Sequence, residues 1–258
     1  MSKSHNIEIL TFKDVKKAAR TLYESFDDDD VARYCSRHLE NDPQRKLDVD
    51  LAMYEAYVSV HIMKGLAIGI KGENASDADN ETFETVALWE IPNGGDMSDY
   101  ITLIRSGFAK LAWKTGAEGR KRIFQTMFPV LHGNFHDIMH NKGEENTFTL
   151  VYLGSTPKAR GKGNVRAIFE WMFQNYIDKN NSVAYLESSS VNNFPIYEKF
   201  GFKPVADIWL GDKNDPVDSA RMDVMIRGPN GSTWEYLEET RIRREYTIPK
   251  ECSEYVSN

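Results

Sequence analysis

The stretch of chain that most constrains the fold is a basic, glycine-containing loop over residues 155–163. An apolar run, residues 148–153, precedes it, and an amphipathic run, residues 165–177, follows it. This order predicts a strand, a loop and the start of a helix. Gly161 and Gly163 let the backbone approach a ligand where a Cβ atom would block it. Because the first turn of a helix offers unpaired N–H groups and partial positive charge, the loop is predicted to bind an anion such as phosphate.

Positive side chains reinforce this prediction. The segment carries no acidic residue, although the net charge of the whole chain is -7. Neither GxxxxGK[ST] nor GxGxxG occurs, so a P-loop and a dinucleotide fingerprint are excluded. A solvated basic turn remains the alternative, because a short glycine motif alone is weak evidence. The cationic residues are Lys158, Arg160, Lys162 and Arg166.

Composition limits the class of protein. The chain has 258 residues, 41% hydrophobic and 28% charged, which is typical of a soluble globular protein. A sequence pI near 5.5 argues against broad nucleic-acid binding, and no apolar run is long enough to span a membrane. The N-terminus lacks the apolar segment of a signal peptide, and Cys35 and Cys252 form no CxxC motif, so a cytoplasmic protein is expected.

The periodicity of the apolar residues predicts an α/β (α+β) domain with helices covering a mixed sheet. We predict a single domain over residues 1–258, with a helical insertion at 92–146 and a charged C-terminal extension at 232–258. The polar link at 72–81 reads as a hairpin connection, and the acidic run at 27–30 as a helix cap. Strands are expected at 7–12, 66–70, 82–89, 148–153, 183–187, 202–210 and 220–227, and helices at 14–26, 47–63, 100–113, 120–140 (broken near Pro129 or Gly133), 165–177 and 192–200.

Two motifs together resemble the GCN5-related N-acetyltransferase superfamily. Arg160-Gly161-Lys162-Gly163 resembles the family's pyrophosphate loop, and residues 185–188 with 193–202 resemble its later strand and Tyr-x-x-x-Gly-Phe helix. The resemblance implies a mostly antiparallel central sheet of about seven strands. A narrower resemblance, to puromycin N-acetyltransferase and its relatives, rests on Ala87-Leu88-Trp89 and on the Asn-x-Pro-x-Tyr form of residues 193–197.

The resemblance implies acetyl coenzyme A as the co-substrate. The loop would hold its diphosphate, backbone groups of the preceding strand would meet the pantetheine arm, and Asn193 would hydrogen-bond that arm; a helix cap or turn role is the alternative for Asn193. Val165 departs from the family's usual Gly or Ala, and we expect it to face the core. The expected cofactor-binding residues are Val151, Tyr152, Leu153, Lys158, Arg160, Gly161, Lys162, Gly163, Asn164, Val165, Arg166 and Asn193.

Transfer of an acetyl group to an amine needs a base and an acid. The resemblance implies Tyr197 as the general acid for the departing sulfur; packing in the core beside Phe200 and Phe202 is the alternative. Glu187, at the end of a strand, and Glu90, after Trp89, are rival candidates for the base, and an ordinary exposed acid is the alternative for each. A small-molecule amine is the expected acceptor, with Trp89 and Phe135 lining its site; ordinary core packing is the alternative for both.

Three histidines recur every four residues, at His132, His136 and His140. On one helix they share a face, and Asp137 or Glu144 would complete a zinc site. There is no HExxH motif, so we expect surface or substrate-facing histidines and no metal. The leading functional prediction is therefore an acetyl-CoA-dependent N-acetyltransferase without an acetyl-enzyme. A non-catalytic acyl-CoA-binding sensor on the same fold is the alternative, and the oligomeric state is left open.

Overall fold

The computed structural model describes residues 6–72, 82–95, 97 and 99–249. The polar link at 72–81 and the end of the C-terminal extension lie mainly outside these residues. The strands are β1 (Ile7–Ile9), β2 (Leu66–Ile70), β3 (Thr85–Glu90), β4 (Thr147–Ser155), β5 (Val183–Ser188), β6 (Lys203–Gly211) and β7 (Ser219–Arg227). The α-helices are α1 (Val15–Ser25), α2 (Asp30–Ser36), α3 (Pro43–Lys64), α4 (Tyr100–Ser106), α5 (Phe108–Lys114), α6 (Gly116–Arg120), α7 (Phe128–Met139), α8 (Asn164–Met172), α9 (Phe194–Glu198) and α10 (Leu237–Arg243).

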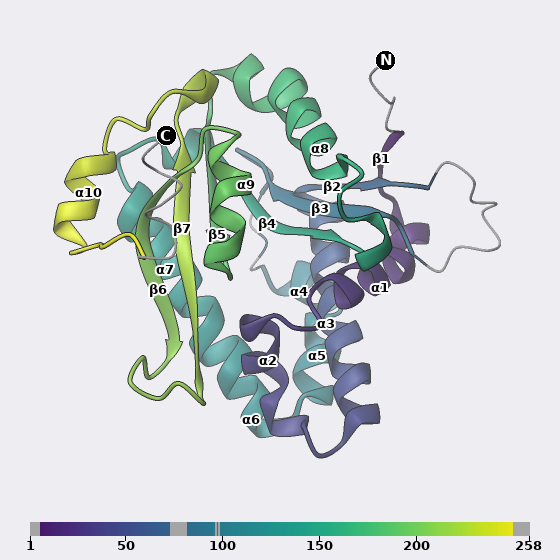
Figure 1. Ribbon diagram of the computed structural model, residues 1–258. Coiled ribbons are helices and arrows are strands. Elements are labelled where there is room, and N and C mark those ends of the chain that lie inside the picture. Colours follow the sequence, from purple (N-terminus) through teal and green to yellow (C-terminus); the bar gives the residue numbers. More distant parts are fainter. Residues whose placement is uncertain (1–5, 73–81, 96, 98, 250–258) are drawn as a thin grey trace. The chain divides into compact units, whose positions relative to one another are not determined.

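These elements make a mixed α/β fold with a seven-stranded sheet, in the order β1-β2-β3-β4-β5-β7-β6 (Figure 1). β1, β2 and β3 pair antiparallel, as do β5, β7 and β6. The predicted fold class is thereby confirmed, including the mostly antiparallel character of the sheet. A register shift between Pro204 and Ala206 marks a β-bulge in β6.

The chain divides into two compact units. Unit 1 comprises residues 1–28, 36–119 and 150–172, and unit 2 comprises 29–35, 120–149 and 173–258. The predicted single domain with its helical insertion stays a prediction. No helix among the described residues has both the length and the apolar composition that crossing a bilayer requires.

Unit 1 is built around the long helix α3. Asp42 caps this helix by accepting a hydrogen bond from the Arg45 backbone N–H, and Pro43 occupies its first turn, where a missing N–H costs nothing. α3 packs against α1, β2 and β3. Gly65 ends the helix at a place where a Cβ atom would lie 2.4 Å from the Trp89 carbonyl oxygen. Only glycine permits so close an approach between the end of α3 and β3.

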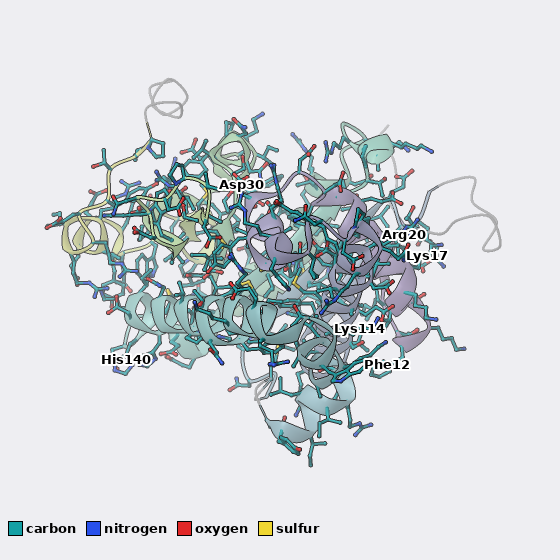
Figure 2. All side chains as sticks on the ribbon, turned by 90° about the horizontal axis from the view of Figure 1, so that it is seen from below. Phe12, Lys17, Arg20, Asp30, Lys114 and His140 are labelled. Atoms are coloured by element: carbon teal, nitrogen blue, oxygen red, sulfur yellow. The ribbon has the colours of Figure 1, made fainter. Side chains whose placement is uncertain are left out.

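Unit 2 has its own apolar core. β7 and the helices α7, α9 and α10 pack against β6. α7 ends at Met139, and His140 is its C-cap residue (Figure 2). The buried cluster comprises Ile138, Met139, Val183, Tyr185, Val205, Ala206, Ile208, Val224, Ile226, Trp234 and Leu237.

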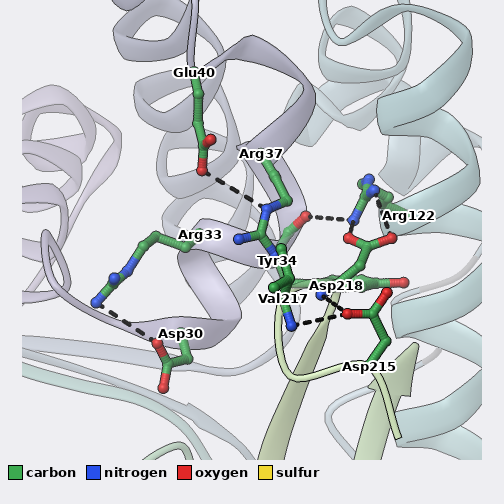
Figure 3. A network of polar contacts seen from close by, with 9 residues as sticks. All are labelled: Asp30, Arg33, Tyr34, Arg37, Glu40, Arg122, Asp215, Val217 and Asp218. Carbon is green, nitrogen blue, oxygen red and sulfur yellow. Dashed lines mark hydrogen bonds and ion pairs between the residues drawn. The ribbon is translucent and has the colours of Figure 1, made fainter. Parts of the chain in front are cut away.

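A polar network fixes the turn between β6 and β7 to the rest of unit 2. Arg122 donates two hydrogen bonds to the Asp218 carboxylate, at 2.7 and 3.1 Å, and a third to the Tyr34 carbonyl (Figure 3). Asp215 accepts from the backbone N–H groups of Val217 and Asp218. Bidentate Arg–carboxylate pairs are geometrically demanding, so this turn has a defined conformation.

The predicted helix breaks were partly wrong. The helix expected at 100–113 divides at Gly107, whose φ of 104° belongs to the left-handed region. The region 120–140 continues instead through a π-helical segment, Lys121–Met127, into α7. Pro129 stands in the first turn of α7, where proline is tolerated, and Gly133 lies in open space within the helix. The acidic run does cap a helix as predicted, because Asp29 accepts from the N–H groups of Val31 and Ala32.

Candidate active site

The basic loop joins β4 to α8 within unit 1. A short 3-10 turn, Pro157–Ala159, follows β4, and α8 begins at Asn164. Gly161 and Gly163 both have positive φ, 78° and 85°, which residues with a Cβ atom rarely adopt. Within the described part of the chain, no atom outside the adjacent residues lies within 4 Å of a Cβ added at Gly161. The loop therefore presents its backbone to solvent beside the first turn of a nine-residue helix, as a diphosphate site requires.

The cationic side chains of this loop are not all available to bind an anion. Lys158, Arg160 and Arg166 are exposed. Arg160 makes a long hydrogen bond of 3.5 Å to the Ser25 carbonyl oxygen. Lys162 instead lies 2.6 Å from the carboxylate of Glu84, in an ion pair. Part of the positive charge of the loop is thus neutralised by an acidic residue from another part of the chain.

Glu84 lies outside this loop but contacts it, and the sequence did not predict this contact. Its second carboxylate oxygen accepts a hydrogen bond of 2.9 Å from the Asn164 side chain, and Asn164 also donates to the Thr85 hydroxyl at 3.1 Å. Asn164 is buried, and its side-chain amide is engaged by these two hydrogen bonds, which support the loop. No sequence motif indicates this contact, because it depends on β3 and β4 being neighbours in the sheet. Glu84 stands immediately before β3.

The strand before the loop is held by aromatic contacts. Val151, Tyr152 and Leu153 are half-buried. The ring of Tyr152 meets Tyr57 edge-on at 4.9 Å between centroids, and it also contacts Phe26 and Tyr54. Gly154 approaches α1 closely, since a Cβ atom there would lie 2.7 Å from the Cβ atom of Ser25. These contacts fix the backbone of β4 at the residues expected to meet the pantetheine arm.

Trp89 and Glu90 stand at the end of β3. Trp89 is fully buried and packs edge-on against Phe169 of α8 at 6.0 Å. Its Nε1 atom has no hydrogen-bond partner within the described part of the chain. This environment matches the core-packing alternative for Trp89. Glu90 is half-buried.

In unit 2, two candidate residues, Glu187 and Phe135, both contact Tyr185. The Tyr185 hydroxyl donates a hydrogen bond of 2.9 Å to Glu187, two residues along β5 on the same face. The ring of Phe135 meets the Tyr185 ring edge-on at 5.0 Å. Tyr185 is fully buried, whereas Glu187 and Phe135 are half-buried. One buried tyrosine thus contacts both candidates: its hydroxyl contacts the candidate base Glu187, and its ring contacts the candidate acceptor residue Phe135.

Tyr197 lies in the short helix α9 of unit 2. Its ring is 6.1 Å from the ring of Phe202, and its carbonyl oxygen accepts the N–H groups of Phe200 and Phe202. Burial, with a smaller contribution from the Asp29 carboxylate, raises the pKa of Tyr197 to about 12. The hydroxyl therefore keeps its proton at neutral pH, as a proton donor must. The ring contacts also match the packing alternative, and both roles can hold for one side chain.

Asn193 precedes α9 in the helix motif. Its side chain makes no capping hydrogen bond to the backbone of that helix, so the capping alternative does not account for its amide. Asn193 is half-buried. The candidate residues thus fall into two sets. Unit 1 carries the loop residues, Trp89 and Glu90, and unit 2 carries Phe135, Glu187, Asn193 and Tyr197.

Comparisons with known proteins identify the class. No family model matches the chain. An uncharacterised N-acetyltransferase of Schizosaccharomyces pombe is 37% identical over 218 residues, which cover 84% of this chain and 81% of the relative. A solved structure from Corynebacterium glutamicum, described as histone acetyltransferase HPA2 and related acetyltransferase, aligns with a TM-score of 0.53 at 18% identity, over 90% of this chain and 99% of that one. A mosquito arylalkylamine N-acetyltransferase-like protein aligns with a TM-score of 0.54 at 14% identity, over 87% of this chain and all of that one.

The fold and the relatives define an acyltransferase of the N-acetyltransferase class. The chain belongs to the GCN5-related N-acetyltransferase superfamily, as the two sequence motifs predicted. The narrower resemblance to puromycin N-acetyltransferases stays a prediction.

Proposed function

We propose that this protein transfers an acetyl group from acetyl-CoA directly to a primary amine of a small molecule. The observation that carries the proposal is the loop after β4, with two positive-φ glycines and exposed cations at the N-terminus of α8. The yeast relative, an N-acetyltransferase by name over most of both chains, supports an enzyme rather than a sensor.

The residues present fit the co-substrate's diphosphate. Gly161 leaves open space beside the backbone, and Arg160 and Lys158 present exposed cations to an anion. Glu84 orders the loop through Lys162 and Asn164, so these two residues support the site more than they contact its ligand. Ordering before binding reduces the entropy that binding costs. Val151, Tyr152 and Leu153 are assigned to the pantetheine arm through their backbone groups, and Asn193 through its amide.

The thioester supplies an activated acetyl group when acetyl-CoA is bound. The chain must then deprotonate the acceptor, because an amine with a lysine-like pKa of about 10.4 needs roughly 4–5 kcal/mol to become neutral at pH 7. We assign Glu187 as the base that accepts the proton of the amine; its position is fixed by the Tyr185 hydroxyl. Glu90 is the rival base. Tyr197, protonated at neutral pH, is assigned as the donor to the leaving sulfur.

The side chains near Glu187 and the net charge of the chain indicate the chemical class of the acceptor. Phe135 packs on Tyr185 and is half-buried, which suits an amine with an apolar portion. The net charge of -7 attracts cations, so a protonated amine is drawn to the protein. The mosquito neighbour is named for arylalkylamines, which combine these two properties. A cytoplasmic location belongs to the same proposal, and Cys35 is buried and forms no disulfide within the described residues.

Calorimetry on the full-length chain tests the loop. Arg160→Glu is expected to weaken acetyl-CoA binding more than tenfold, because charge-assisted hydrogen bonds contribute about 1.5–3 kcal/mol. Lys179→Glu is the matched control, an exposed cation in a turn of unit 2 that receives the same change of charge. Equal loss in both variants, or unchanged affinity in Arg160→Glu, contradicts the loop assignment.

Release of free thiol with a panel of amines tests the reaction itself. Arylalkylamines and aliphatic polyamines distinguish an apolar acceptor from a purely cationic one. Tight binding of acetyl-CoA without turnover across the panel contradicts the proposed transfer and favours the non-catalytic acyl-CoA-binding sensor.

A further inference from the structure

Two exposed histidines stand one turn apart at the end of α7. His136 is in the last turn of this helix. His140, which is labelled in Figure 2, is its C-cap residue. Their ring centroids are 4.7 Å apart and the rings are tilted by 46°. Both side chains are more than half exposed, 62% for His136 and 57% for His140. Histidines four residues apart on a helix share one face, so both can reach one ion.

A carboxylate meets both histidines. Glu144 begins the short 3-10 helix Glu144–Asn146, which follows the turn after α7. Its Oε1 lies 3.2 Å from Nδ1 of His136, and its Oε2 lies 3.7 Å from Nδ1 of His140. One potential ligand atom from each residue lies within 4.8 Å of the others. Zinc bonds of 2.0–2.2 Å in a tetrahedron place ligand atoms about 3.4 Å apart, so small rotations of exposed side chains complete the geometry.

The backbone around these residues is well fixed. Asn141 and Gly143 have positive φ, 58° and 95°, which turn the chain back toward α7. The Lys142 N–H bonds the Met139 carbonyl at 2.8 Å, and the Thr147 hydroxyl bonds the Gly143 carbonyl at 2.7 Å. The last turn of α7 is anchored by Met139, which is fully buried. Glu144 is therefore held opposite the two histidines by structure that does not depend on an ion.

Neighbouring charged groups have other partners. Lys142 donates to Glu239 at 2.9 Å and lies over the rings of Trp234 and Tyr236. Asp137, which the sequence offered as a possible ligand, receives a hydrogen bond of 2.9 Å from Arg243. The pairing with Arg243 removes Asp137 from the ligand set, and Lys142 is engaged by Glu239.

We propose that His136, His140 and Glu144 bind a transition-metal ion of the Zn²⁺ class. Two imidazoles and one carboxylate are ligands that this ion accepts, and three protein ligands leave a fourth position for water. The bound ion cross-links the end of α7 to the 3-10 helix that leads into β4. This proposal departs from the expectation of no metal, and the position of Glu144 is the reason. This site is independent of the proposed acetyl transfer.

Zinc binding by the full-length, tag-free chain tests the proposal. Zn²⁺ is titrated in competition with a chromogenic chelator, and we expect one ion per chain. His136→Ala, His140→Ala and Glu144→Gln should each weaken binding more than tenfold. His132→Ala is the matched control, because this exposed histidine of α7 bonds the Phe128 carbonyl oxygen at 2.8 Å and is outside the cluster. Its affinity for zinc should stay within twofold of the parent chain.

Thermal unfolding gives a second readout. Zn²⁺ should raise the melting temperature of the parent chain and of His132→Ala, but not that of the double variant His136→Ala, His140→Ala, since an ion that binds only the folded state stabilises it. The proposal is overturned if the double variant binds zinc as tightly as the parent, if His132→Ala loses as much affinity as His136→Ala, or if the parent binds no zinc at 100-fold molar excess.

Discussion

The ammonium group of Lys162 lies 2.6 Å from the carboxylate of Glu84, 78 residues earlier in the chain. The same carboxylate accepts from the buried amide of Asn164. One acidic residue therefore holds both the middle and the end of the candidate phosphate loop. The Lys162 side chain is 43% exposed, whereas Asn164 is buried, so the two interactions differ in their energetic weight.

Glu84→Ala should lower the free energy of unfolding by about 1–3 kcal/mol, because it leaves the buried Asn164 amide with one acceptor fewer. Lys162→Met removes only the solvent-exposed ion pair and should cost less than about 1 kcal/mol. Urea unfolding followed by circular dichroism measures both. A larger loss in Lys162→Met than in Glu84→Ala would show that the ion pair, and not the buried amide, stabilises the loop.

Substitution of the two candidate bases separates them. Glu187→Gln should lower kcat by about 10²–10⁴, the usual contribution of a general base, while the amide oxygen still accepts from Tyr185. Glu90→Gln should change kcat by less than about threefold, because a residue outside the proton transfer does not act as a general base. Steady-state kinetics at saturating acetyl-CoA measures both variants. If Glu90→Gln shows the larger loss, the roles of the two residues are exchanged.

Tyr197→Phe should reduce turnover more than acetyl-CoA affinity, because phenylalanine keeps the ring contact with Phe202 and removes only the hydroxyl. Tyr176→Phe is the control for loss of a tyrosine hydroxyl in unit 2. The pKa of Tyr197 is raised to about 12, so this group stays protonated and should produce no falling limb in the rate between about pH 7 and pH 10. A falling limb in that range that disappears in Tyr197→Phe is the contrary result.

His61 makes stability depend on pH. It is buried in α3, its Nδ1 atom pairs with the Tyr57 carbonyl oxygen at 2.7 Å, and burial lowers its pKa to about 4. In the unfolded chain the imidazole takes up a proton near pH 6.5, whereas in the folded chain it stays neutral to about pH 4. The contribution of His61 is therefore complete above about pH 6.5 and is lost as the pH falls toward 4, by up to about 3 kcal/mol.

The difference between two variants isolates this effect. Urea unfolding between pH 7.5 and 4.5 should show a steeper loss of stability in the parent chain than in His61→Leu. His132→Ala, which removes an exposed histidine, should follow the parent chain. Parallel curves for the parent and His61→Leu would mean that His61 titrates alike in the folded and unfolded states.

Sequence periodicity predicted the elements of the fold better than their ends. The strands at 66–70 and 183–187 were found within one residue, because their apolar runs are bounded by polar or glycine residues. The helix at 100–113 was not divided at Gly107, because its apolar spacing continues across the glycine and only the backbone φ shows the break. The predicted break in 120–140 did not occur, because the π-helical segment Lys121–Met127 runs directly into α7 at the position of Pro129.

The candidate site was predictable only where it is local in sequence. The loop glycines and the start of α8 could be read from consecutive residues. Glu84 could not, because its contact depends on which strands are neighbours, and the burial of Trp89 depends on packing against α8. Glu144 was named as one of two possible partners for the histidines, and the structure distinguishes it from Asp137 through the Arg243 pairing.

The contact of Glu84 with Lys162 and Asn164 has a consequence for synthesis of the protein. When a ribosome has synthesised only the first half of the chain, Glu84 is present but the loop is not, so the candidate anion site cannot form until translation has passed α8. Bringing together parts of the chain that are so far apart in sequence costs entropy, which only the assembled strands offset. Fragments that end before residue 164 should therefore fail to retain acetyl-CoA even where they fold.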